Sequence, residues 1–266
     1  MTHSDLGAVL LPVGDLRLGP VRLSPYGVCA TVGVVLAMAL AGRLARRVSV
    51  APEAVWDAGL FAVACCFVSS RLLLVLSDPK AFLRYPVLVL SLPSLTIGGL
   101  LLAGIAVGIY LWRKRLPLPA VLDTFAAPGA LLAAFLELGH WLEGSEIGMP
   151  VLRAGDRAVV GFRPVSLYGV GLALALLIAL WSVLGKLRIP GHVAALGLAL
   201  GGVFAFVLDM LSVPLELFSN LALEPGQMVA LAAMLSGALL WAFAPRCAER
   251  EALTTEFVTR RQEEVR

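Results

Sequence analysis

Seven long runs of apolar residues, separated by short polar segments, dominate the hydrophobic pattern of this chain. They lie at residues 26–41, 56–76, 87–112, 120–140, 165–184, 192–213 and 227–244. A helix needs about 20 predominantly apolar residues to cross the hydrocarbon core of a bilayer. The pattern therefore predicts an all-α fold, a polytopic membrane protein built as a bundle of seven transmembrane helices. The third run contains Pro93, Gly98 and Gly99, so we expect it to begin as a broken or re-entrant piece, with its continuous helix nearer 96–112.

Composition favours a membrane protein over a soluble domain. Hydrophobic residues make up 59% of the 266 positions and charged residues only 15%, which is too little charge to cover the surface of a soluble domain. The four cysteines show neither a disulfide framework nor metal-ligand spacing, so we expect no metal and no cofactor. The net charge of +3 comes largely from clusters at the ends of the runs, and it indicates anionic lipid rather than nucleic acid as a partner.

Lys and Arg collect at the ends of the odd-numbered runs, which sets the expected orientation. They are Arg43, Arg46, Arg47, Arg113, Lys114, Arg115, Lys186, Arg188, Arg246, Arg250, Arg260, Arg261 and Arg266. By the positive-inside rule the N-terminus lies outside and the C-terminus in the cytoplasm. Four tryptophans then form an aromatic belt at the cytoplasmic boundary: Trp56, Trp112, Trp181 and Trp241. We expect an outside segment at 1–25, the membrane domain at 26–244 and a charged cytoplasmic tail at 245–266.

Ionisable side chains inside an apolar run are costly in hydrocarbon and often mark function. Glu137 and His140 are three residues apart at the end of the fourth run, so they share one face of a helix. Polar residues of the other runs fall at the same outer level in the expected orientation. They are Tyr26, Arg71, Arg163, Tyr168 and Asp209. This convergence predicts a site at the outer leaflet of the membrane.

The residue types suggest how such a site would work. We expect Arg71 and Arg163 to hold a lipid phosphate, because guanidinium groups bind phosphate through paired hydrogen bonds. We expect His140, oriented by Glu137 or Glu143, to act as a base close to neutral pH. Tyr26, Tyr168 and Asp209 would complete the lipid-binding part of the site.

Simpler explanations exist for the same residues. Arg71 can extend to the interface alone, and His140 with Trp141 can be an interfacial anchor. Asp123, at the cytoplasmic start of the fourth run, is better explained as a helix cap or an ion-pair partner than as a catalyst. Two glycine pairs have the spacing of helix-packing motifs, Gly104 with Gly108 and Gly197 with Gly201.

Short motifs occur in a fixed order along the chain. They are Gly19-Pro20, Tyr26-Gly27, Arg71-Leu72, Gly98-Gly99, Asp123 with Ala127-Pro128, Pro164 with Leu167 and Tyr168, and Gln227. In order and spacing this set, from about residue 13 to residue 244, resembles the bacterial prolipoprotein diacylglyceryl transferases. The resemblance implies a multi-pass enzyme of the bacterial cytoplasmic (inner) membrane that acts in lipoprotein biosynthesis. It would move diacylglycerol from phosphatidylglycerol, or another anionic phospholipid, to the lipobox cysteine thiol at the prolipoprotein signal peptide.

The chain departs from the family pattern where the family signature, G-R-x-G-N-F-x-N-G-E, should lie. The corresponding residues run from Leu136 to Ser145, and Glu137 stands in place of the signature arginine. The resemblance implies four further replacements, at Ile97, Arg163, Gly169 and Ala205. A glutamate beside an anionic headgroup repels it by a few kcal/mol in a dry site. A standard or variant transferase, a divergent or inactive paralogue that binds lipid, and a small membrane carrier or assembly factor therefore remain open.

Overall fold

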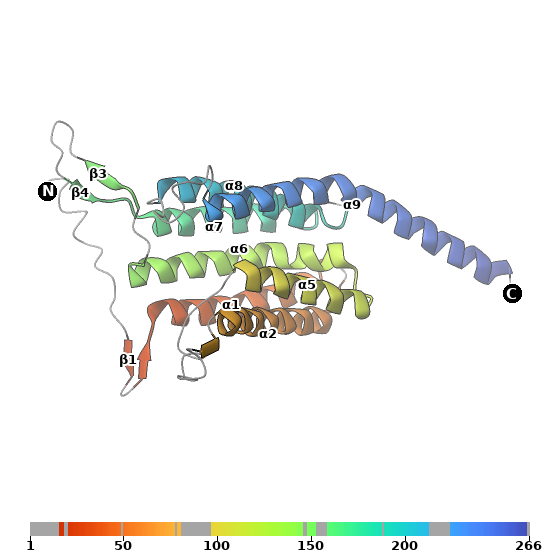
Figure 1. Ribbon diagram of the computed structural model, residues 1–266. Coiled ribbons are helices and arrows are strands. Elements are labelled where there is room, and N and C mark those ends of the chain that lie inside the picture. The colour runs from red at the N-terminus through yellow and green to blue at the C-terminus, as the bar shows by residue number, and fades with distance from the viewer. Residues whose placement is uncertain are drawn as a thin grey trace.

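The computed structural model of the protein describes residues 16–18, 21–48, 50–77, 79–80, 97–145, 148–152, 159–187, 189–212 and 224–264. Within these residues seven long helices form a bundle, and two short hairpins lie at one end of it (Figure 1). The helices are α1 (Pro25–Ala45), α2 (Pro52–Ser77), α5 (Ile97–Arg113), α6 (Leu118–Glu143), α7 (Val165–Val183), α8 (His192–Leu211) and α9 (Pro225–Glu264). The antiparallel hairpins pair β1 (Leu16–Leu18) with β2 (Val21–Leu23) and β3 (Pro150–Leu152) with β4 (Val159–Phe162).

Six of the helices are long and apolar enough to cross a membrane, which confirms the prediction of a multi-pass helical membrane protein. They are α1, α2, α6, α7, α8 and the part of α9 from Pro225 to Ala244. Helix α5 is also apolar, but its 17 residues give a length of only about 26 Å. Its bounds agree with the continuous part that we predicted at 96–112. The broken piece predicted before it falls at residues 87–95, outside the described residues, and the count of seven spans stays a prediction.

The two hairpins depart from the predicted arrangement. The hairpins were not predicted, because strands of three or four residues are too short to show an alternating pattern. The first hairpin falls within the segment that we predicted to lie outside the membrane at 1–25, and residues 1–15 of that segment lie outside the described part of the chain. Helix α9 is 40 residues long, so the backbone of the predicted charged tail is helical as far as Glu264.

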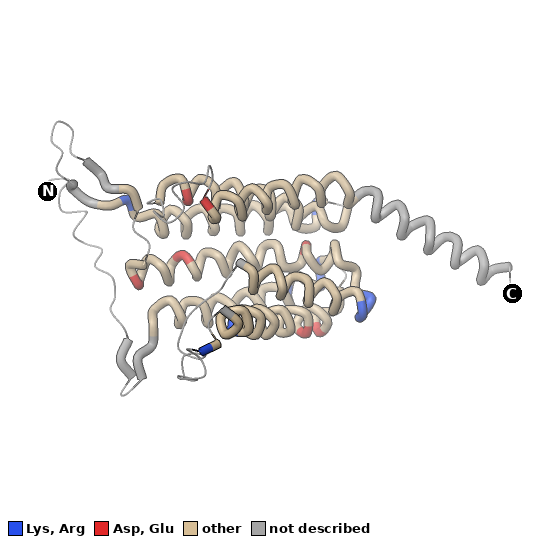
Figure 2. Tube along the Cα trace, viewed as in Figure 1, with Lys and Arg blue, Asp and Glu red and all other residues tan. Residues whose placement is uncertain are grey.

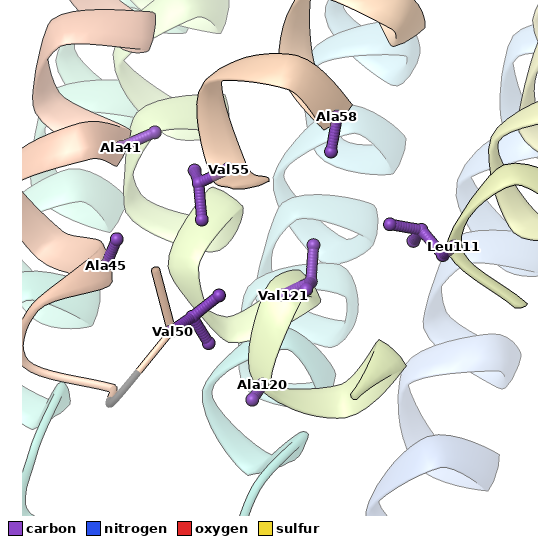
Figure 3. Packing of buried hydrophobic residues seen from close by; sticks show 8 residues of the cluster. All are labelled: Ala41, Ala45, Val50, Val55, Ala58, Leu111, Ala120 and Val121. Carbon is purple, nitrogen blue, oxygen red and sulfur yellow. The ribbon is translucent and has the colours of Figure 1, made fainter. Parts of the chain in front are cut away.

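Helix α6 is the centre of the bundle and packs against α1, α7 and α8. Helix α2 lies between α1 and α5, and α9 packs along α8. One buried cluster joins α1, α2, α5 and α6, and its side chains point toward one another (Figure 3). Its members are Ala41, Ala45, Val50, Val55, Ala58, Leu111, Ala120 and Val121. Most are alanine or valine, and such small side chains let helix backbones approach closely, as is common between helices in membranes.

The two glycine pairs with the same spacing behave differently. A Cβ added at Gly197 would lie 3.3 Å from Leu180 of α7, and one added at Gly201 would lie 3.6 Å from Leu176. The predicted packing role is therefore confirmed for this pair. A Cβ added at Gly104 or Gly108 would meet nothing within 4 Å in the described part of the chain. No described neighbour covers that face of α5, and the packing role of that pair stays a prediction.

The carboxylate of Asp123 ties α6 to α8. Its Oδ2 accepts a hydrogen bond from the Gly191 backbone N–H at 2.7 Å, and its Oδ1 accepts one from the Ala194 N–H at 2.8 Å. Asp123 is therefore a helix cap, as predicted, although it caps the start of α8 and not its own helix. The neighbouring His192 is buried, and its ring stacks on Trp241 of α9 with centroids 4.2 Å apart.

Basic and aromatic residues gather at the end of the bundle opposite the hairpins. Figure 2 shows Lys and Arg at the turn between α5 and α6, at this end. The guanidinium of Arg47 lies 5.4 Å from the ring centroid of Trp181, and Trp56 lies against Gly42 near the end of α1. With Trp112 at the end of α5, the four predicted belt tryptophans lie at one level and are 40–79% exposed. The side of the membrane on which this level lies stays a prediction.

Candidate functional site

The candidate site is built at the end of α6, where the chain reverses. Gly144 takes a left-handed conformation with φ 66° and ψ 25°. The Gly144 N–H donates to the Trp141 carbonyl at 3.2 Å, and the Ser145 N–H donates to the His140 carbonyl at 3.2 Å. This is the Schellman pattern of helix termination, for which glycine is the usual residue at the left-handed position. The reversal places Ser145 beside the last turn of its own helix.

The imidazole of His140 is held by two neighbours. Its Nδ1 lies 2.9 Å from the Ser145 Oγ, and that hydroxyl also lies 3.4 Å from the His140 carbonyl oxygen. If the hydroxyl donates to the carbonyl, Nδ1 must carry a proton and donate to the hydroxyl, which leaves Nε2 as a proton acceptor. This tautomer is assigned from the hydrogen-bond pattern. The Tyr26 ring lies over the imidazole, with centroids 4.6 Å apart and planes tilted by 43°.

Tyr26 reaches His140 because α1 and α6 approach closely at Gly139. A Cβ added at Gly139 would lie 3.0 Å from the Tyr26 Cα and 3.2 Å from the Cys29 Cβ. The start of α1 is also bonded to the end of α6, since the Ser24 Oγ donates to the Glu143 Oε1 at 2.9 Å. The same Oγ accepts the Gly27 N–H at 3.2 Å and so caps α1. One serine therefore both starts α1 and fixes it to α6.

Glu137 reaches the neighbouring helix α7. A Cβ added at Gly169 would lie 2.7 Å from both the Cδ and the Oε2 of Glu137. The Glu137 carboxyl group therefore occupies the space that the absent side chain of Gly169 leaves. Tyr168, the residue before this glycine, is 47% exposed on the first turn of α7.

Among the described residues the hydrogen-bond partner of the His140 imidazole is Ser145. We had predicted Glu137 or Glu143 as the group that orients the ring. Glu143 bonds Ser24, and Ser145 takes the position beside Nδ1. The physical reason is the left-handed Gly144, which turns the chain back after the helix ends. Neither serine was predicted as a site residue. A Ser-Pro pair at a helix start and a Gly-Ser pair at a helix end are signals that identify both.

The remaining predicted site residues lie toward the same end of the bundle on other elements. The Arg71 guanidinium lies 5.2 Å from the ring centroid of Phe67 on α2. Arg163 is exposed between β4 and α7, and its backbone N–H donates to the Met149 carbonyl at 3.2 Å. Asp209, near the end of α8, contacts Gly226 of α9. Its Oδ2 is buried and has no hydrogen-bond partner among the described residues.

The described contacts thus join only some of the predicted site residues to one another. They join Tyr26 to His140 and Glu137 to the first turn of α7. The segment at Gly148 and Met149 links the start of α7 to the end of α8 through a bridge to Ser212 and a bond to the Leu211 carbonyl at 3.1 Å. The described residues contain no group of three or more His, Cys, Asp or Glu side chains that is able to hold a metal ion. The arrangement offers an imidazole and a carboxyl group positioned on α6, with Arg71 and Arg163 on other elements toward the same end of the bundle.

Comparison with known proteins gives a consistent result. The family model for prolipoprotein diacylglyceryl transferase matches residues 15–243. The phosphatidylglycerol–prolipoprotein diacylglyceryl transferase of Corynebacterium efficiens is 31% identical over 150 residues, 52% of this chain and 46% of its own length. The enzyme of that name from Frankia alni is 30% identical over 171 residues, 58% of this chain and 45% of its own. That from Corynebacterium diphtheriae is 33% identical over 150 residues, 52% of this chain and 53% of its own.

The chain aligns with about half the length of the curated relatives that it matches. The family model, in contrast, covers β1, β2, α1 to α8 and the membrane-length part of α9 almost to its end. The chain belongs to the prolipoprotein diacylglyceryl transferase family.

Proposed function

We propose that the chain transfers the diacylglyceryl group of phosphatidylglycerol to the cysteine thiol of a prolipoprotein, at the outer face of the bacterial cytoplasmic (inner) membrane. The observation that carries the proposal is the family match over residues 15–243. The printed names of the relatives supply the donor and the acceptor. Six helices of membrane-spanning length suit a donor that stays in the bilayer during the reaction.

The proposal includes seven spans with the N-terminus outside and the C-terminus in the cytoplasm. The basic residues at the turn between α5 and α6 support this orientation, because such residues favour the cytoplasmic side. The candidate site then faces outward, where the cysteine of a secreted acceptor becomes accessible. The segment at 1–25 is outside, 26–244 forms the membrane domain, and 245–266 is cytoplasmic.

The reaction is a substitution at the glycerol carbon that carries the phosphodiester oxygen. The thiolate sulfur forms a bond to that carbon while the carbon–oxygen bond breaks, and glycerol phosphate leaves with the electron pair. We assign the thiol proton to Nε2 of His140, since the bond from Nδ1 to Ser145 leaves Nε2 free to accept it. Tyr26 over the imidazole and Ser145 at its edge hold the ring in one orientation.

Binding of the donor is assigned to the polar residues that other helices bring to this end. Arg71 and Arg163 hold the phosphate, because guanidinium groups form paired hydrogen bonds with phosphate oxygens. Tyr26, Tyr168 and Asp209 complete the lipid-binding part of the site. No cofactor takes part in the proposed reaction.

The position of Glu137 supports a change in which helix carries the acid of the site, relative to the family pattern. The resemblance implies an arginine at position 137 and a glutamate at position 169, where this chain has Glu137 and Gly169. The Glu137 carboxyl group lies in the space above Gly169. An acid carried by α6 therefore takes the place of an acid carried by α7, and the arginine is lost. The phosphate is accordingly bound away from position 137.

The test uses the purified full chain in detergent with phosphatidylglycerol and a peptide that contains a lipobox cysteine. Release of glycerol phosphate, together with a gain of one diacylglyceryl group in the peptide mass, is the expected result. A peptide with serine in place of the cysteine gives neither product. Absence of both products, while a relative with the complete signature is active in the same assay, would overturn the proposal. Retention of phosphatidylglycerol without turnover would identify a lipid-binding paralogue instead.

A further inference from the structure

The turn between α5 and α6 contains an open hollow that lies far from the candidate site. Its lining residues are Trp112, Arg113, Arg115, Leu116 and Pro117, and its volume is about 560 Å³. Helix α6 begins beside this hollow and ends at the candidate site, and its 26 residues separate the two by about 39 Å. That distance exceeds the roughly 30 Å thickness of the hydrocarbon core. The hollow and the candidate site therefore belong to opposite interfaces of the membrane.

The backbone of Arg115 does not favour an arginine. Arg115 has a φ of 53° and is the one residue other than glycine with a positive φ among the described residues. The Leu116 N–H donates to the Leu111 carbonyl and the Arg115 N–H to the Trp112 carbonyl, both at 3.0 Å. The same Schellman pattern ends α6, where Gly144 occupies the left-handed position. Glycine is the residue that this turn prefers, so the reason for Arg115 lies in its side chain.

The side chains around the hollow combine cationic and apolar chemistry. Arg113 and Arg115 are exposed, and guanidinium groups bind phosphate through paired hydrogen bonds. Trp112 is 79% exposed, and tryptophan is enriched at the level of lipid headgroups, where its ring lies partly in the apolar region. Leu116 and Pro117 extend the apolar part of the lining. A free phosphate ion would use only the cations, whereas a phospholipid uses both parts.

We propose that this hollow binds the phosphate headgroup of an anionic phospholipid, in the leaflet opposite the candidate site. Arg113 and Arg115 hold the phosphate, and Trp112 lies against the glycerol and the first carbons of the acyl chains. In the proposed orientation this is the cytoplasmic leaflet, whose surface carries negative potential. The site takes no part in the transfer reaction, and it anchors the turn that starts the central helix α6.

The test locates a bound lipid on the full chain in nanodiscs of phosphatidylcholine. A photoactivatable phosphatidylglycerol is added, and crosslinks are counted separately in the peptide that contains residues 112–117 and in peptides of the hairpin end. The test variant combines Arg113→Gln with Arg115→Gly, because glycine keeps the turn while removing the side chain. The matched control combines Arg43→Gln with Arg46→Gln, which removes the same charge from exposed arginines of the same end of the bundle.

The parent chain should crosslink at 112–117, and unlabelled phosphatidylglycerol should compete while phosphatidylcholine should not. The test variant should lose this crosslink by about tenfold or more, as expected when two charge-assisted contacts are removed, and should keep its crosslinks at the hairpin end. Its melting temperature should not fall, because glycine suits the turn; a purely structural role of Arg115 predicts a fall. Unchanged crosslinking in the test variant, or an equal loss in the control, would overturn the proposal. Competition by soluble glycerol phosphate as strong as that by the lipid would overturn the assignment to a lipid.

Discussion

The carboxylate of Asp123 closes the start of a helix other than its own, so replacing it with alanine should loosen α8 from α6. Only 4% of this residue is exposed, and both carboxylate oxygens accept backbone N–H groups of α8, at 2.7 Å and 2.8 Å. The N-cap residue of α8, Gly191, has a φ of 94° and makes no side-chain cap of its own. In the alanine variant two backbone donors therefore lose their partner inside the protein.

The size of the effect follows from these two bonds. A hydrogen bond to a charged group contributes about 1.5–3 kcal/mol, and loss of an N-cap side chain alone costs about 0.5–2 kcal/mol. Asp123→Ala should therefore lower the free energy of unfolding by about 3–5 kcal/mol. Asp123→Asn should cost about half as much, because the amide oxygen can serve one donor while its NH₂ faces the other.

The measurement is thermal unfolding of the purified protein in one detergent, followed by circular dichroism. For a chain of this size 1 kcal/mol corresponds to about 2–4 °C, so Asp123→Ala should lower the melting temperature by roughly 6–20 °C. Asp57→Ala removes an exposed acid of α2 and is the matched control. A surface change of this kind stays within about 0.5 kcal/mol. A melting temperature for Asp123→Ala within about 2 °C of the parent would refute the assignment of the carboxylate as the cap of α8.

Three further predictions concern the candidate site. His140→Ala should abolish alkylation of the lipobox peptide while the melting temperature changes little. Ser145→Ala should lower the rate, because the hydrogen bond that fixes the tautomer is lost. Near-normal kinetics in either variant would contradict the role of the imidazole. Gly139→Ala should destabilise the protein by about 1–3 kcal/mol, since the added Cβ meets the α1 backbone. Gly129→Ala on the same helix should stabilise it slightly, because its added Cβ meets no described atom within 4 Å. Equal melting temperatures would contradict the close approach. Gly169→Ala should reduce activity by displacing the Glu137 carboxyl group of α6, and unchanged activity would count against that placement.

The bounds of α1 and α6 follow closely from the sequence, because strong local signals mark the start of one and the end of the other. Ser24 and Pro25 begin α1, and Gly144 ends α6. The contacts that form the site are much harder to predict from the sequence. Ser24 and Glu143 are 119 positions apart, so nothing in the local pattern of either pairs them. The glycine pairs make the same point, since equal spacing gave contacts on α8 but, among the described residues, none on α5.

Glu137 and His140 show how far helical spacing alone can predict a site. Their separation of three residues places both on one side of α6, and that expectation needs only the helix. Their partners depend on other elements. The Glu137 carboxyl group lies over α7 because position 169 is glycine, and the His140 imidazole bonds Ser145 because position 144 is glycine. Two glycines, which carry no side chain, thus decide what the two ionisable residues contact.

This geometry limits where the donor phosphate is bound in the proposed reaction. Two unit charges 4 Å apart interact by about 4 kcal/mol at an effective dielectric constant of 20, so a phosphate beside the Glu137 carboxylate would be strongly repelled. The carboxyl group is turned toward Gly169 of α7, while the Glu143 carboxyl group, at the end of α6, bonds Ser24 at the start of α1. In the proposed reaction Arg71 and Arg163 hold the phosphate away from the Glu137 carboxyl group, with the glycerol carbon near the His140 imidazole. Because its carboxyl group occupies the space above Gly169, the glutamate at the signature position does not by itself exclude the proposed catalysis.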